Sequence, residues 1–313
     1  INDTLKISKY KKNTIVYGST DFKEKFKLKY KNIYIKKSIF KSQNRSYAEE
    51  FAKLEKKRKS NLIEIHNRPA YLNYLLKLLE NRNYILYFHN DPLSMNGSRS
   101  ISERIFLLRN CFKIIFNSNW SKRKFLEGMK IDHINSEKLI VINQSAQKSN
   151  VNLKSKKNII TFVGKLNKSK GYDIFGNAII KVLNKHKKWS SIVVGDEPRD
   201  KIQFNHKKLV SLGFLNHKEV INIYKKSSIA VICSRWEEPF GRTSLEAAAN
   251  GCAVIISDRG GLKETITNGV ILKKLDHINL FKEIEILIKN NKKRLSLQRL
   301  SLQNFYLTHS YIS

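Results

Sequence analysis

The chain has 313 residues, of which 41% are hydrophobic and 10% aromatic, and it carries a formal net charge of +34. This length favours two domains, and the apolar content is sufficient to build a core in each. No apolar run approaches the roughly 18 residues of a membrane span, and the three scattered cysteines indicate neither a disulfide framework nor a zinc site.

The first half of the chain alternates short apolar strands with helical stretches, which predicts a doubly wound parallel sheet of the α/β class. Residues 14–18 read as a second strand, so we expect that a first strand and its glycine-rich loop are missing. Later strands run into polar clusters at residues 63–69, 87–92 and 117–126. Because open α/β sheets bind ligands at the carboxyl ends of their strands, these clusters hold candidate binding residues.

A polar stretch at residues 146–158 is the predicted linker between two domains. We place the first domain at residues 1–147 and the second at residues 156–313. The second domain begins with a buried strand at residues 159–163, after which strands and helices continue to alternate. The same α/β architecture is therefore expected in both halves.

Two glutamates eight positions apart, Glu238 and Glu246, lie where a predicted strand breaks into a helix. The apolar run at residues 229–233 predicts the buried strand, and residues 243–249 predict the helix. One carboxylate is then on the loop, and the other is in the first helical turn beside unpaired backbone amides, which favour anions. Residues 243–246 also fit a capping box, in which Glu246 bonds only to the amide of the cap residue.

The next apolar run, residues 253–257, predicts another buried strand, and Gly260 and Gly261 follow it. Two glycines after a strand allow a ligand to approach the backbone closely, or they simply form a tight turn. The two glutamates, the second strand and the glycine pair are together much more specific than any one of them.

In combination these segments, residues 238–246 and 251–264, resemble the donor site of the family 4 retaining glycosyltransferases, which have the GT-B fold. Upstream, residues 162–171 resemble the family's Gly-Arg-Leu to Lys-Gly segment, and residues 193–198 resemble its Val-Gly-Asp-Gly-Pro turn. The resemblance covers roughly residues 158–270, and the polar clusters of the first half match more loosely.

The resemblance implies a GT-B protein, in which two doubly wound Rossmann-like domains face each other across a cleft. The first domain would bind the acceptor and the second the nucleotide sugar, and residues 303–313 would begin the helix that closes back onto the first domain. The family's Pro-Asn-Gly is absent at residues 141–145. The implied enzyme is a retaining, hexosyltransferase-type glycosyltransferase, which transfers a sugar from a nucleotide-diphosphate donor to a carbohydrate or lipid-linked acceptor in surface polysaccharide or glycolipid biosynthesis.

Glycosyl transfer develops negative charge on the diphosphate leaving group, so positive charge is required beside it. Lys165 and Lys170 follow the strand at residues 159–163 and can supply that charge together with helix amides. Framed by Gly164 and Gly171, they fit this role better than that of ordinary surface lysines, although the family has arginine at the first position. No Asp-x-Asp pair, which holds a divalent metal in many glycosyltransferases, occurs in the sequence. We therefore predict a reaction with no metal and no other cofactor.

Residue by residue, the resemblance implies that Glu246 accepts hydrogen bonds from the ribose hydroxyls and that Glu238 faces the transferred sugar. His89 matches the family's acceptor-side histidine, although a histidine after a strand is often structural. The predicted catalytic set is Glu238, Lys165, Lys170 and His89. The other donor-binding candidates are Gly164, Phe240, Gly241, Arg242, Gly213, Phe214 and Leu215, and the acceptor-side candidates are His66, Arg68 and Asn90.

The sequence leaves two other functions open. A GT-B sugar-nucleotide epimerase also has two such domains, although the segments around Lys170 and Glu238 fit it less well. A non-catalytic basic protein that binds nucleic acid or membrane would need a concentrated basic face, whereas the charge here is spread from Lys6 to Arg299. A general compositional bias is the simplest explanation of that charge, so no nucleic-acid partner is expected.

Attraction to an anionic membrane is the remaining interpretation of the charge, because clustered basic residues near such a surface contribute about 1 kcal/mol each. The candidate patches are residues 53–59 and 121–124, and both are equally compatible with plain solvated faces. We expect a cytoplasmic protein, either free or peripherally associated with the inner face of the membrane.

Overall fold

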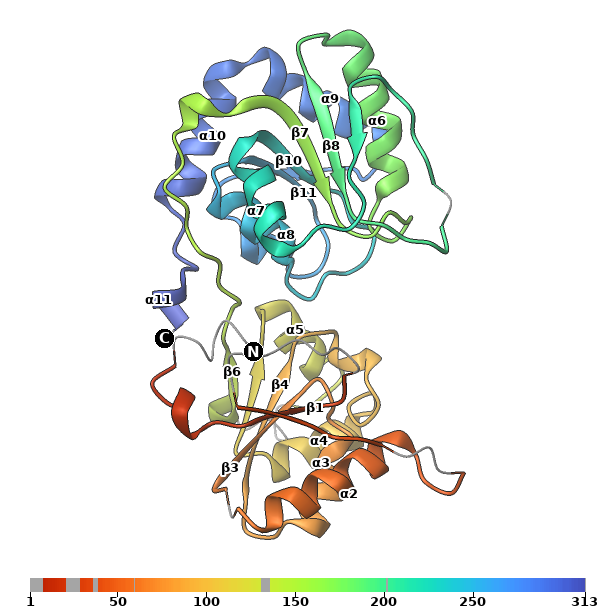
Figure 1. Ribbon diagram of the computed structural model, residues 1–313, viewed down its shortest axis with the longest axis vertical. Coiled ribbons are helices and arrows are strands. Elements are labelled where there is room, and N and C mark those ends of the chain that lie inside the picture. The colour runs from red at the N-terminus through yellow and green to blue at the C-terminus, as the bar shows by residue number, and fades with distance from the viewer. Residues whose placement is uncertain are drawn as a thin grey trace. The chain divides into compact units, whose positions relative to one another are not determined.

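The structure is a computed structural model that describes residues 8–20, 29–35, 39–58, 60–130, 136–200 and 202–312. The chain divides into two compact units, Ile1–Asn143 with Ile312–Ser313, and Gln144–Tyr311. Figure 1 shows the first unit in red to yellow and the second in green to blue. Each unit has its own parallel sheet and its own hydrophobic core.

A four-stranded parallel sheet forms the centre of the first unit. Its strands stand in the order β3 (Leu62–His66), β4 (Asn83–Phe88), β5 (Lys113–Phe116) and β6 (Leu139–Val141). The helices in the described part of this unit are α2 (Gln43–Lys56), α3 (Tyr71–Leu78), α4 (Ile101–Asn110) and α5 (Asn119–Leu126). The rings of Phe88, Phe116 and Phe125 lie 5.3 to 5.6 Å apart and join β4, β5 and α5 in one core.

The strand predicted at residues 14–18 is present as β1 (Val16–Gly18), which pairs in parallel with β2 (Tyr30–Asn32). Among the described residues these two strands form a separate sheet. The sequence predicted β1 as the second strand of the first unit's main sheet, but β1 does not pair with any strand of that four-stranded sheet. The described residues of the unit also form the short 3-10 helices η1 (Lys11–Asn13), η2 (Pro92–Ser94) and η4 (Ser136–Lys138).

A six-stranded parallel sheet forms the centre of the second unit, in the order β12-β11-β10-β7-β8-β9. Read from β9, this is third, second, first, fourth, fifth and sixth along the chain, which is the Rossmann strand order. The order reverses between the two central strands, β7 and β10. The strands are β7 (Lys157–Val163), β8 (Ser190–Val194), β9 (Leu209–Ser211), β10 (Ser227–Ile232), β11 (Ala253–Ser257) and β12 (Val270–Leu272).

Helices cover both faces of this sheet. Alternate residues of β10 point to opposite faces, so Ile229 and Val231 join a core with α6 (Tyr172–Lys185) and α9 (His277–Lys289), while Ala230 and Ile232 join the other. The second core contains α7 (His217–Lys226) and α8 (Arg242–Ala249). Burial on both faces explains the continuous apolar runs at the two strands predicted from residues 229–233 and 253–257.

The predicted linker, residues 146–158, follows the boundary between the units and packs on the second one. The Ala146 amide donates to the Leu307 carbonyl at 3.0 Å, and the Ser149 hydroxyl donates to the Asn250 side chain at 2.7 Å. The described part of this unit also contains η5 (Leu153–Ser155), η6 (Leu262–Thr265) and α10 (Asn291–Gln303), and α11 (His309–Ile312) begins in it. None of the helices in the described ranges combines the length and apolar character needed to cross a bilayer.

Candidate functional site

The candidate site of the second unit lies where the strand order reverses, at the carboxyl ends of β7 and β10. Open α/β sheets bind ligands in the crevice at such a switch point, because the loops that leave the two strands diverge to opposite faces. The loop after β7 carries Lys165 and Lys170, and the loop after β10 carries Glu238. The topology therefore places at one edge of the sheet three residues that lie up to 73 positions apart in the sequence.

Backbone contacts hold these two loops against each other. The amides of Arg235 and Trp236 both donate to the Ser169 carbonyl, at 2.9 and 3.0 Å. Gly171 has a φ of +74°, and a Cβ there would come within 1.9 Å of the Cys233 carbonyl oxygen, so only glycine fits. The Arg235 guanidinium bonds both carboxylate oxygens of Asp173, at 2.6 and 2.8 Å.

Lys170 and Glu238 form an ion pair across this junction. The Lys170 ammonium lies 2.5 Å from Glu238 Oε1, and the pair is partly shielded from solvent. The amide of Lys170 also donates to the Asn167 side chain at 3.0 Å, which fixes the loop at this point. The residues predicted to meet the diphosphate and the sugar are thus in direct contact.

The glycine pair after β11 supports the Glu238 loop from the other side. The Gly261 amide donates to the Glu238 carbonyl at 2.6 Å, and a Cβ on Gly260 would come within 2.1 Å of that same carbonyl oxygen. Glu237 accepts from the Gly260 amide at 2.6 Å and from Arg259 at 3.0 Å. The close approach at these glycines is made by the Glu238 loop itself, and the structural role of Glu237 was not predicted from the sequence.

Lys165 takes part in a different ion pair. Its exposed ammonium is 4.0 Å from Glu197, whose carboxylate is bound by the Arg199 guanidinium at 2.7 Å. Hydrogen bonding to Arg199, opposed by desolvation and reinforced by the charges of Arg199 and Lys165, lowers the pKa of Glu197 to about 2. Gly164 precedes Lys165, and its amide donates to the Val194 carbonyl at 3.0 Å.

Glu246 does not form the capping box that its sequence position allows. The helix begins at Arg242, one residue earlier than predicted, and its N-cap is Gly241 with a φ of +113° and no side chain to cap the helix. Glu246 Oε1 instead accepts from Arg242 Nε at 2.6 Å and from His217 Nε2 at 2.9 Å. The capping-box interpretation was wrong because glycine can supply the left-handed cap conformation that patterns of capping side chains do not reveal.

The remaining donor-binding candidates fall into two environments. The Phe240 side chain is buried in the core beside α8, so only its backbone can face a ligand. After β9, the Gly213 carbonyl accepts from the Gly195 amide at 2.8 Å, the Phe214 side chain is 82% exposed and Leu215 packs against the core. This segment leads directly into the first residue of α7, which is His217.

The acceptor-side candidates gather at the carboxyl ends of β3 and β4 in the first unit. The His66 and His89 rings are stacked, and His66 Nδ1 lies 2.9 Å from His89 Nε2. Burial, followed by the neighbouring His66, lowers the pKa of His89 to about 4, so its imidazole is neutral at pH 7. The Asn67 side chain accepts from the amides of His89 and Asn90 at 2.7 and 3.3 Å.

Arg68 is exposed, and its guanidinium bonds the Asn67 carbonyl at 2.9 Å. The anchoring role of Asn67 was not predicted. Its φ of +56° is the structural signal, because asparagine tolerates the left-handed region better than most residues do.

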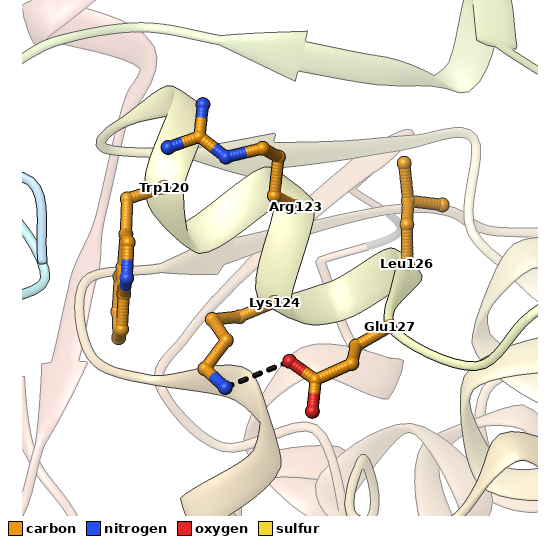
Figure 2. A pocket seen from close by; sticks show the side chains of 5 residues that line it. All are labelled: Trp120, Arg123, Lys124, Leu126 and Glu127. Carbon is orange, nitrogen blue, oxygen red and sulfur yellow. Dashed lines mark hydrogen bonds and ion pairs between the residues drawn. The ribbon is translucent and has the colours of Figure 1, made fainter.

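A pocket on the first unit lies along one face of α5 and is lined by Trp120, Arg123, Lys124, Leu126 and Glu127 (Figure 2). Four of these residues recur at helical spacing, and Lys124 pairs with Glu127 at 2.7 Å. The pocket contains none of the predicted site residues. Two of its lining residues, Arg123 and Lys124, belong to the basic run at residues 121–124. Ser121, the first residue of that run, is buried.

No group of three or more histidine, cysteine, aspartate or glutamate side chains within the described ranges is arranged to hold a metal ion.

Comparison with known proteins gives a consistent picture. The family model described as "Glycosyl transferases group 1" matches residues 143–300. Spore coat protein SA of Bacillus subtilis is 26% identical over 279 residues, which are 79% of this chain and 74% of that protein. The lipopolysaccharide core biosynthesis mannosyltransferase LpcC of Rhizobium leguminosarum is 32% identical over 123 residues, which are 36% of this chain and 35% of that protein.

Solved structures show the same fold. Anabaena Alr3699/HepE in complex with UDP and glucose superposes with a TM-score of 0.76 at 17% identity, over 99% of this chain and 92% of that chain. A glycosyltransferase from Rickettsia africae superposes with a TM-score of 0.71 at 21% identity, over 90% and 82%.

Proposed function

Because this chain belongs to the group 1 glycosyl transferases and has the GT-B fold, we propose that it transfers a hexose from a nucleotide-diphosphate sugar to an acceptor hydroxyl with retention of configuration. The observation that carries the proposal is the Lys170–Glu238 ion pair at the switch point of the second unit. A cation and a carboxylate at the same ligand-binding edge suit the two ends of the donor's scissile bond, its phosphate and its sugar.

In the proposed reaction the bond between the anomeric carbon and the phosphate oxygen breaks, and a bond to the acceptor oxygen forms on the same face of the sugar. The proton of the acceptor hydroxyl passes to an oxygen of the leaving phosphate. Lys170, with Lys165, stabilises the charge that develops on the diphosphate, while Glu238 orients the sugar. Phe240 and Gly241 offer backbone amides to the same ligand, and Glu246 binds the ribose.

We propose that the reaction needs no metal, and the support is the absence of an Asp-x-Asp pair from the sequence. On the acceptor side, His89, His66, Arg68 and Asn90 would bind the acceptor, with the neutral His89 imidazole available to a sugar hydroxyl. The complex of Alr3699/HepE with UDP and glucose makes uridine diphosphate sugars the first donors to test. The similarity to LpcC, a lipopolysaccharide core biosynthesis mannosyltransferase, favours a role in surface polysaccharide or glycolipid biosynthesis.

We further propose a cytoplasmic location with peripheral association at the inner membrane face. The supporting observation is the end of α2, where Lys56, Lys57 and Arg58 are all exposed, while Lys53 of the same run is paired with Glu50. Lys59 of the same run lies outside the described residues. The second run, residues 121–124, supports the proposal less, because Lys124 is already paired with Glu127.

The test is a transfer assay with uridine, guanosine and adenosine diphosphate sugars and a panel of octyl glycosides, with EDTA present throughout. We expect release of one nucleoside diphosphate together with a product whose new linkage keeps the anomeric configuration of the donor, measured by proton NMR. An inverted product would overturn the retaining mechanism. Activity that appears only when Mg²⁺ or Mn²⁺ is supplied in excess of the EDTA would overturn metal independence.

A further inference from the structure

Glu246 is a buried carboxylate with one oxygen engaged and the other open. Its side chain is 6% exposed, and both of its hydrogen bonds, from Arg242 and His217, end on Oε1. Among the described residues, Arg82 Nε is the single fully buried side-chain polar atom without a partner. Oε2 of Glu246, for which the described residues supply no donor, therefore reaches solvent and can accept a hydrogen bond from a ligand.

His217 holds this carboxylate from a different element. It is the first residue of α7, and a reciprocal capping box between Asn216 and Glu219 fixes the start of that helix. A carboxylate only accepts hydrogen bonds, so the His217 imidazole donates to Glu246 through its Nε2 hydrogen. The contact is therefore directional and fixes the orientation of the Glu246 carboxylate.

Two further features place His217 at the site rather than in the core. Its side chain is 60% exposed, ten times the fraction of Glu246, so it lines the surface around that carboxylate. Tyr224, seven residues later on the same helical face, is buried, and the charge of Glu246 contributes to raising its pKa. The face of α7 that begins at His217 is thus directed toward Glu246.

The chain leading into His217 carries three of the donor-binding candidates that the sequence predicts. Gly213, Phe214 and Leu215 end two residues before it, and the Gly195–Gly213 bond fixes that segment on the sheet. His217 therefore lies in sequence next to three donor-binding candidates and in space next to Glu246.

We propose that His217 is a positioning residue of the donor site, which with Arg242 holds Glu246 Oε1 so that Oε2 is presented to the ribose of a ribonucleoside diphosphate. This inference rests on the proposed function. A site built to bond a hydroxyl discriminates against a ligand that lacks it, because its own polar group is then left without a partner. His217 consequently makes the site selective for ribose over 2′-deoxyribose.

The experiment measures dissociation constants by calorimetry for uridine, guanosine and adenosine diphosphates and their 2′-deoxy analogues, on the whole chain. The variants are His217→Ala, His217→Gln, whose amide can still donate to Glu246, and His217→Phe, whose ring cannot. His277→Ala is the matched control, because His277 is also the first residue of a capped helix. Thermal unfolding without nucleotide reports any purely structural effect of each substitution.

We expect the wild-type chain to bind the ribonucleotide with a dissociation constant about tenfold lower than that of its 2′-deoxy analogue. This is the difference expected when one hydrogen bond to a charged group is lost. His217→Ala and His217→Phe should lose most of that preference by weakening the ribonucleotide alone, while His217→Gln and His277→Ala should keep it. If the wild type binds a ribonucleotide and the alanine and phenylalanine variants keep both its affinity and its preference, the role of His217 is overturned and the proposed function stands. If no nucleoside diphosphate binds the wild type, the proposed function itself fails.

Discussion

At the scale of single residues, the donor site is organised around charges that are already paired. Lys170 and Glu238 contact each other at 2.5 Å, and Glu246 is held by Arg242 and His217. Hydrogen bonds between ionised groups are among the stronger ones in proteins, so each partner fixes the position of the other. A site that is fixed before the donor arrives loses little energy to reorganisation when charge develops on the phosphate.

Removal of the Lys170 ammonium should therefore act on the chemical step. We expect Lys170→Ala to lower kcat by about 10²- to 10³-fold, the usual effect of deleting one group that stabilises developing charge. The measurement is the initial rate of nucleoside diphosphate release at saturating donor. Lys168→Ala is the matched control, since Lys168 is an exposed lysine of the same loop. A Lys170→Ala enzyme with the kcat of the Lys168→Ala control would contradict the role of this ion pair.

His89 should make the stability of the chain depend on pH. Burial, and then the neighbouring His66, lower its pKa from 6.5 to about 4, so between these values the unfolded chain binds the proton more readily. This contribution to the free energy of unfolding is fully present above pH 6.5 and is lost as the pH falls toward 4, up to about 3 kcal/mol. Urea unfolding at pH 7 and pH 5 should show a larger loss for the wild type than for His89→Gln. Equal losses would mean that His89 titrates normally in the folded state.

At the scale of elements, the site is a junction of three loops that pack backbone to backbone. Gly171 of the β7 loop contacts the end of β10, and Gly260 of the β11 loop contacts the backbone of Glu238. Such close approaches leave no room for a Cβ atom, so glycine is required at each of these two positions. The position of Glu238 thus depends on the glycines of the neighbouring loops.

A methyl group at Gly260 should displace the Glu238 loop. Its Cβ would come within 2.1 Å of the Glu238 carbonyl oxygen, and the φ of +58° adds strain of about 1 kcal/mol for alanine. We expect Gly260→Ala to lose about 1–3 kcal/mol of stability and most of its donor affinity. Gly128→Ala is the control, because its φ is +76° but its Cβ would meet only Ile101 Cδ1, at an ordinary contact distance of 3.5 Å. If the two variants behave alike in donor binding, strain rather than displacement explains the effect.

The sequence predicted the elements of the second unit better than the contacts between them. Strands β10 and β11 were predicted because both of their faces are covered, which requires unbroken apolar runs. The hydrogen bond between His217 and Glu246 was not predicted, because it joins residues 29 positions apart on two different helices. Of the residues that the family resemblance assigned to donor binding, Lys170 and Glu238 contact each other. Lys165 contacts Glu197 instead.

At the scale of the whole molecule, the strand order of the second unit accounts for the place of the site. The order reverses between β7 and β10, and the loops that carry Lys170 and Glu238 leave the sheet at those two strands. The family match and the fold agree with the transferase predicted from the sequence. The net charge of +34 is a property of the chain as a whole rather than of this site.

Part of that charge should attract the chain to anionic bilayers. We expect sedimentation with vesicles that contain phosphatidylglycerol and not with pure phosphatidylcholine, and the binding should weaken as salt is added. Combined alanine substitution of Lys56, Lys57 and Arg58 should weaken it about a hundredfold, at about 1 kcal/mol for each charge. Alanine at Lys168, Lys187 and Lys188 of the second unit changes the net charge equally and is the control. Equal losses for the two triple variants would show that total charge, not the end of α2, drives binding.

The central claim is that the carboxyl edge of the second unit's sheet binds a nucleotide-diphosphate donor through Glu246. The most direct measurement is the shift in thermal unfolding caused by uridine, guanosine and adenosine diphosphates, without metal, on the chain and on Glu246→Ala. Binding stabilises the folded state by RT ln(1 + [L]/Kd), which is about 2.7 kcal/mol at a hundredfold excess over Kd. The account predicts that one nucleotide stabilises the wild type and that Glu246→Ala loses this effect. Equal stabilisation of both proteins, or of neither, would contradict it.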